Sequence, residues 1–81
     1  MAIMRLLVDK ARRRQRLPSK RQLAVLIGID AARLSNYESG ARRCPVSRVA
    51  QLAELAGLDV ERMVGRYELE WLKQKGGDDK D

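Results

Sequence analysis

Apolar residues recur along this 81-residue chain at intervals of three and four positions, the repeat of a helix with one buried face. Its two prolines, Pro18 and Pro45, fall between such segments, and no stretch alternates apolar and polar residues for long enough to form a strand. The pattern predicts an all-α fold that forms a single domain over residues 1–75, followed by a disordered polar tail over residues 76–81. The expected helices cover about residues 3–15, the segment from Ser19 to Gly28, the segment from Ala31 to Ser39, the segment from Pro45 to Gly57 and about residues 60–75.

Capping residues mark the ends of the second and third helices. Ser19 and Gln22 have the spacing of a capping box, in which the serine hydroxyl accepts a backbone N–H of the first turn. Asp30 is expected to cap the third helix in the same way. Gly28 and Gly40 follow these helices, and glycine most readily takes the left-handed conformation that ends a helix. The two short helices are therefore predicted to meet at a tight turn.

Three residues in this segment have the spacing of a helix-turn-helix. Two helices that cross steeply over a short turn leave room only for a small side chain where they touch, which Ala24 provides. The turn needs a positive φ, which Gly28 provides, and Leu34 with Tyr37 would anchor the second helix on the core. Together with the caps, this Ala-x3-Gly-x5-Leu pattern predicts a helix-turn-helix over about residues 19–39.

A longer set of residues carries a family resemblance: Gln22-Leu23-Ala24, Gly28-Ile29, Leu34-Ser35-Asn36-Tyr37-Glu38-Ser39-Gly40, Arg42-Arg43, Pro45 and the run from Val49 to Gly57. With them the chain resembles the Cro/C1 family, the lambda-repressor-like domains of phage and bacterial regulators, over about residues 3–64. The resemblance implies a compact five-helix lambda-repressor-like domain that binds double-stranded DNA. The run before the charged last helix is similar to small phage immunity repressors of the filamentous-prophage kind.

Two features depart from the family pattern. The linker Arg16-Leu17-Pro18 is one residue longer than usual, which leaves the register of the first helix open. Ala31-Ala32 begin the third helix, where many relatives carry polar residues that read bases.

The outward face of the third helix contains the candidate base-reading residues. With Leu34 and Tyr37 buried, a step of about 100° per residue defines the opposite side of the helix. In this motif the N-terminal part of the second helix enters the major groove, where asparagine pairs with adenine, alanine contacts a thymine methyl group and arginine binds guanine or a phosphate. The alternative interpretation of Asn36 is an exposed polar residue near a helix end that contacts only water. The candidate base-reading residues are Ala31, Ala32, Arg33, Ser35 and Asn36.

Phosphate contacts are expected on both sides of this helix, by the same resemblance. The start of the second helix offers free backbone N–H groups to a phosphate, and a basic loop follows the third helix. The candidate phosphate-binding residues are Ser19, Lys20, Arg21, Arg42 and Arg43. The two loop arginines also fit plain surface charges. The family often pairs an arginine of the first helix with a glutamate at the position of Glu38, which here points to Arg12 or Arg13.

Charge is concentrated in the first half of the chain. The whole chain has a net charge of +6, whereas residues 1–43 hold eleven Lys and Arg against three acidic residues, a net of +8. Such segregation suits a surface that faces a polyanion. The chain has no histidine and one cysteine, so we expect no metal site, no cofactor and no enzyme of the Ser-His-Asp or Cys-His kind.

The expected location is the cytoplasm of a bacterial host, in association with the nucleoid. No segment is long and apolar enough to cross a membrane, and the N-terminus lacks the order of a signal peptide. Cys44 would stay a thiol in that compartment and is interpreted as a tolerated small residue.

The last predicted helix points to a homodimer. Its apolar stripe continues through Tyr67 to Trp71 and Leu72, beyond the point where the core should close. An exposed tryptophan is unusual unless it meets a partner, so these three residues are expected at the dimer interface. Two alternatives stay open: Trp71 packs on the first helix over Ile3 and Leu6, or the dimer forms through another surface, such as the loop after the fourth helix.

These features predict a sequence-specific regulator that binds a palindromic duplex operator and represses transcription by occlusion. Its abundance or an antirepressor protein would control it. An antitoxin or an excision factor would use the same fold. Two other classes are a protein-interaction module that keeps the fold without binding DNA, and an RNA-binding protein that uses the basic first helix.

Overall fold

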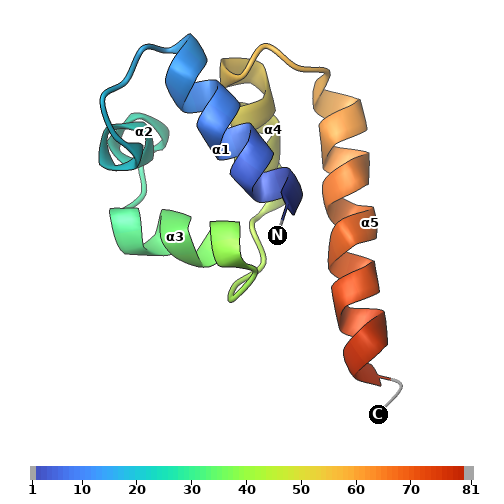
Figure 1. The fold of residues 1–81 in the computed structure, drawn as a ribbon. Helices are drawn as coiled ribbons and strands as arrows, with labels where there is room; N and C mark the ends of the chain where they lie inside the picture. Colours follow the sequence, from blue (N-terminus) through green and yellow to red (C-terminus); the bar gives the residue numbers. More distant parts are fainter. Residues whose placement is uncertain (1, 80–81) are drawn as a thin grey trace.

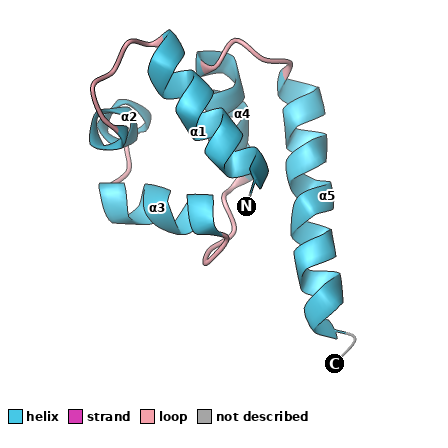
Figure 2. Ribbon diagram, viewed as in Figure 1, coloured by secondary structure: helices cyan, strands magenta, loops and turns pink. Residues whose placement is uncertain are grey.

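All five segments predicted from the apolar spacing are helical in the computed structural model, which describes residues 2–79 and contains no strand in that range (Figures 1 and 2). The prediction of an all-α five-helix fold is confirmed. The helices are α1 (Ala2–Arg14), α2 (Lys20–Ile27), α3 (Ala31–Ser39), α4 (Val46–Leu55) and α5 (Val60–Asp79).

The predicted caps bound α2 and α3. The Ser19 hydroxyl accepts the backbone N–H of Gln22 at 3.3 Å, and the Asp30 carboxylate accepts the N–H of Arg33 at 2.6 Å. Gly28 ends α2 with φ 80°, and Gly40 ends α3 with φ 84°. Because an L side chain at these angles is strained, glycine is what lets the chain turn sharply from α2 into α3.

The linker between α1 and α2 closes α1 in a tight turn. Arg16 has φ 57°, a left-handed conformation that a residue with a side chain rarely adopts. The turn is held by the backbone N–H of Leu17, which donates to the carbonyl of Arg12 at 3.0 Å. Gln15 ties the turn to α4, because its amide donates to the carbonyl of Leu55 at 3.0 Å.

The core lies between α1 and α4, with α2 and α3 packed across one end and α5 along the other side of α4 (Figure 1). All five helices bury apolar side chains in one cluster, which excludes water from most of their facing surfaces. The largest fully buried side chains include Met4, Leu7, Leu23, Leu34, Leu52 and Tyr67.

The last helix begins at a side-chain cap and runs further than predicted. Asp59 accepts the backbone N–H of Arg62 at 3.0 Å. α5 then continues to Asp79 rather than to about residue 75, so residues 76–79, expected in a disordered tail, are helical. Residues 80 and 81 of the expected tail lie outside the described residues.

Two of the three residues expected at a dimer interface are covered within the protomer. Tyr67 is fully buried, and its hydroxyl accepts the backbone N–H of Cys44 at 2.6 Å. Trp71 is 9% exposed, with its ring stacked at 6.5 Å from that of Tyr67 and the Arg43 guanidinium 5.9 Å from its centre. The loop after α3 therefore covers the stripe that seemed to need a partner, and only Leu72 of the three stays exposed.

Candidate nucleic-acid interface

α3 presents one side to the core and the other to solvent. Leu34 and Tyr37 are buried beneath it, and Asp30 caps its first turn. The five residues predicted to read bases fall on the outward side: Ala31, Ala32, Arg33 and Ser35 are exposed, and Asn36 is half-buried. The buried residues of α3 thus anchor it on the core, and its solvent-facing surface consists of small and polar side chains.

Polar hollows lie along two flanks of α3. On one flank Ala32, Arg33, Asn36 and Arg42 surround a hollow beside the cap of Asp30. Arg42 is fixed there by its backbone, because its N–H donates to the carbonyl of Asn36 at 3.2 Å. Arg33 and Arg42 outnumber the Asp30 carboxylate among the residues that line this hollow, so this flank of α3 is net positive.

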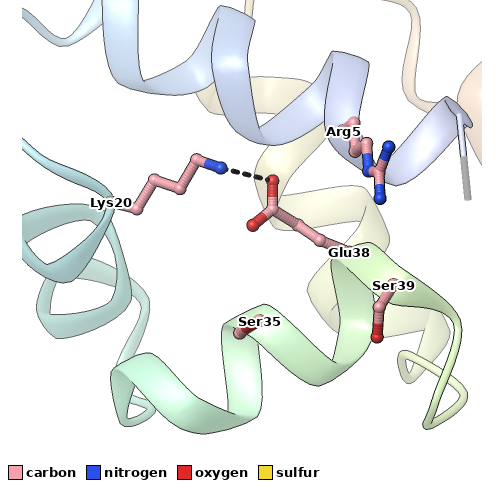
Figure 3. Close-up of a pocket in the computed structure, with 5 residues that line it drawn as sticks. All are labelled: Arg5, Lys20, Ser35, Glu38 and Ser39. Atoms are coloured by element: carbon pink, nitrogen blue, oxygen red, sulfur yellow. Dashed lines mark ion pairs between the residues drawn. The ribbon is translucent and has the colours of Figure 1, made fainter.

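The other flank is built where α1, α2 and α3 meet (Figure 3). Ser35 and Ser39 form its α3 wall, Lys20 reaches in from α2, and Arg5 points toward it from α1. Glu38 lies at its centre, and the ammonium of Lys20 contacts its carboxylate at 3.1 Å. The cations Arg5 and Lys20 outnumber the single carboxylate among these lining residues, so this flank is also net positive.

Glu38 has a partner that the family resemblance did not imply, Lys20 of α2. Arg12 and Arg13 both form ion pairs with Asp9 on their own helix, at 3.5 and 3.2 Å. Arg12 also donates to the carbonyl of Leu17 in the turn that ends α1. These local contacts hold the two arginines at the end of α1, and the lysine at the start of α2 pairs with Glu38.

The five predicted phosphate-binding residues divide into two groups. Ser19, Arg21 and Arg42 are exposed around α3. Lys20 and Arg43 already have acidic partners. Arg43 donates to both carboxylate oxygens of Glu68 on α5, and that hydrogen bond raises the pKa of the guanidinium further above its ordinary value. Arg43 therefore joins the loop after α3 to α5, a structural role that the sequence did not reveal.

Two further arginines have roles that the sequence did not reveal, because no motif marks them. Arg5 of α1 lines the same flank of α3 as Lys20. Arg48 of α4 donates to the carbonyl of Ile27 at the end of α2 and to the amide oxygen of Gln51 at 3.1 Å. A cation is favourable at a helix C-terminus, so Arg48 braces α2 against α4.

Cys44 is a packing residue. Its side chain is fully buried, and burial raises the pKa of the thiol to about 12, although the charge of Arg48 opposes that shift. The thiolate is the reactive form of cysteine, so a thiol with this pKa is inert at neutral pH. The placement supports the interpretation of Cys44 as a tolerated small residue.

In the part of the chain that the structure describes, no group of three or more His, Cys, Asp or Glu side chains is placed to hold a metal ion. Within the same part, none of the helices is long and apolar enough to span a membrane.

Two short helices, a glycine turn between them and a solvent-facing second helix define a helix-turn-helix. A protein-family model described as a helix-turn-helix domain matches residues 10–64, and this chain belongs to that family. The match includes α2, α3 and α4 and ends within α5. The family is one of DNA-binding domains rather than of enzymes. No curated protein and no solved structure matches the chain.

Proposed function

We propose that this protein is a sequence-specific transcriptional regulator that binds double-stranded DNA through the outward face of α3. The observation that carries the proposal is the arrangement of α3, whose candidate base-reading residues lie between two net-positive flanks. A helix about 10–12 Å across fits the major groove of B-DNA, which is about 12 Å wide. When α3 enters the groove, its two flanks face the two phosphate backbones.

Each flank has a distinct part in this proposal. The cations of the two flanks attract the phosphates and set the depth and register of α3 in the major groove. They are Arg33 and Arg42 on one side, and Lys20 and Arg5 on the other. Asn36 then reads an adenine edge, and Ala31 and Ala32 meet thymine methyl groups. The Lys20 ammonium has three donors, so it can contact a phosphate while it keeps its ion pair with Glu38.

The finer assignment is a phage or prophage repressor that acts as a homodimer on a palindromic operator and occludes a promoter. It rests on the resemblance to Cro/C1-type regulators and on the concentration of positive charge in residues 1–43. Control by abundance or by an antirepressor protein, and a location on DNA in the cytoplasm of a bacterial host, belong to the same proposal.

Asn36→Ala should lower the affinity for the specific duplex by about 1–3 kcal/mol and change the affinity for random duplex very little. The substitution removes base recognition and leaves the flanking cations in place. Arg42→Ala is the matched comparison on the same flank, and it should weaken the two duplexes alike, because a phosphate contact carries no sequence information. Fluorescence anisotropy on a labelled operator and a scrambled duplex measures both effects.

Circular dichroism of both variants verifies that α3 remains folded. An equal loss on both duplexes for Asn36→Ala, in a folded protein, would show that Asn36 does not read bases and that the reading face is placed elsewhere.

A further inference from the structure

The outward side of α5 carries two exposed leucines. Leu69 and Leu72 are 61% and 60% exposed, whereas Met63, Tyr67 and Trp71 on the opposite side of the helix are buried. A single exposed leucine needs no explanation, but here two apolar side chains stand together, one turn apart, at the centre of a free helix face.

These leucines belong to a row with the repeat of a two-helix coiled coil. Arg62, Gly65, Leu69 and Leu72 are separated by three, four and three positions, the alternation of the a and d sites of a heptad. We call these four residues the α5 seam. All four are exposed, and a Cβ atom added at Gly65 would meet no other atom within 4 Å, so a second helix can approach closely there.

The charges beside the α5 seam select the direction of such a partner. Glu61 and Glu68 precede the a sites, and Arg66 and Lys73 follow the d sites. In a parallel pair of identical helices, each residue before an a site meets the residue five positions later on the other helix. That places Glu61 against Arg66 and Glu68 against Lys73 of the second copy. An antiparallel pair would place glutamates against glutamates and cations against cations, which is unfavourable.

We propose that the α5 seam binds the same seam of a second copy of this chain, with the two α5 helices parallel. This inference deepens the homodimer part of the proposed function and moves the interface from the stripe of Tyr67 and Trp71 to the opposite face of α5. Arg43 already holds the Glu68 carboxylate at the edge of the seam. A carboxylate has about four acceptor sites, so Glu68 can keep Arg43 and also accept Lys73 of the second copy.

A parallel seam also orients the two reading helices. α3 lies toward the C-terminal end of α5, where the Gln74 amide donates to the carbonyl of Gly40 at 3.3 Å (Figure 1). A two-fold axis that runs along α5 leaves both α3 helices at the same end of the dimer. An antiparallel pair would place them at opposite ends. The parallel arrangement is therefore the one in which two copies can face one duplex.

Disulfide cross-linking of the full chain without DNA tests the seam. In a parallel pair identical d sites face each other, so Leu72→Cys should form an intermolecular disulfide in a glutathione redox buffer at least about tenfold faster than Ser47→Cys, an exposed control on α4. The wild-type chain is the background, because its Cys44 is fully buried. Equal rates for the two variants would overturn the proposal. Faster pairing of Leu69→Cys with Leu72→Cys than of Leu72→Cys with itself would also overturn it, because it indicates antiparallel helices.

A charge reversal provides the second measurement. Arg66→Glu places like charges at the seam and should slow cross-linking of the Leu72→Cys chain several-fold, and adding Glu61→Arg should restore the rate. An unchanged rate in the single reversal contradicts the parallel pairing. Because these experiments contain no DNA, a failed seam leaves the DNA-binding proposal standing, and a failed DNA-binding test leaves the seam standing.

Discussion

Raising the salt concentration from about 50 to 200 mM should weaken binding to the specific duplex by about 10⁴-fold. Four to six phosphate contacts per protomer, doubled in a dimer, correspond to a slope of about −7 to −11 for the logarithm of affinity against the logarithm of salt. We expect the shallow end of that range, because Lys20 and Arg43 already have acidic partners in the free protein. Because a carboxylate already neutralises part of the charge of each of these two cations, each should release fewer counterions from the DNA than an unpaired cation would.

The slope is measured by titrating labelled duplex at four or five salt concentrations. Arg42→Ala should reduce its magnitude by about 1 per protomer, whereas Asn36→Ala should leave it unchanged, because only the first removes a phosphate contact. A slope near zero for the wild-type protein would remove the DNA-binding account as a whole.

Tyr67→Ala should lower the free energy of unfolding by about 3–5 kcal/mol, the cost of truncating a large buried aromatic side chain. Tyr67 is fully buried and bonds the loop at Cys44. Since small domains are stable by about 5–15 kcal/mol, this variant should be close to unfolding or partly unfolded. Urea denaturation followed by circular dichroism measures the change.

Two variants on the same helix separate the causes of that loss. Tyr67→Phe keeps the ring and deletes the hydroxyl, so it should cost about 1–2 kcal/mol through the unpaired N–H of Cys44. Leu72→Ala lies on the exposed face and, at a protein concentration low enough for the chain to be monomeric, should change stability by less than about 0.5 kcal/mol. If Tyr67→Ala left the monomer as stable as the wild type and abolished only self-association, Tyr67 would be an interface residue after all.

The parts of the fold that sequence predicts well here are those with local causes. Ser19 and Asp30 cap their helices because each side chain reaches a backbone N–H three residues away. Gly28 and Gly40 end helices because each tolerates a positive φ at its own position. Such interactions depend on neighbours in the sequence, so residue spacing alone predicts them.

The parts that sequence did not predict depend on pairs far apart in the chain. Trp71 looked exposed because its stripe outran the expected core, yet Arg43 lies over its ring. Lys20 pairs with Glu38, whereas the family resemblance pointed to an arginine of the first helix. Each of these contacts depends on how two helices pack against each other. A periodic pattern predicts which face of a helix is buried, but it does not predict which other helix covers that face.

The candidate site likewise has one part that local sequence predicts and one part that depends on distant contacts. The outward position of Asn36 and its neighbours follows from helix geometry once Leu34 and Tyr37 are buried. The contribution of Arg5 does not, because it depends on the angle at which α1 crosses α3.

Selection from a pool of random duplex DNA, followed by affinity measurement on the selected and a scrambled duplex, tests whether this protein recognises a DNA sequence. The account predicts enrichment of two half-sites with two-fold symmetry, about 10–10.5 base pairs apart centre to centre, and at least about 10³-fold tighter binding than to the scrambled duplex. Equal affinity for the two duplexes, or tighter binding to single-stranded RNA than to any selected duplex, would contradict it.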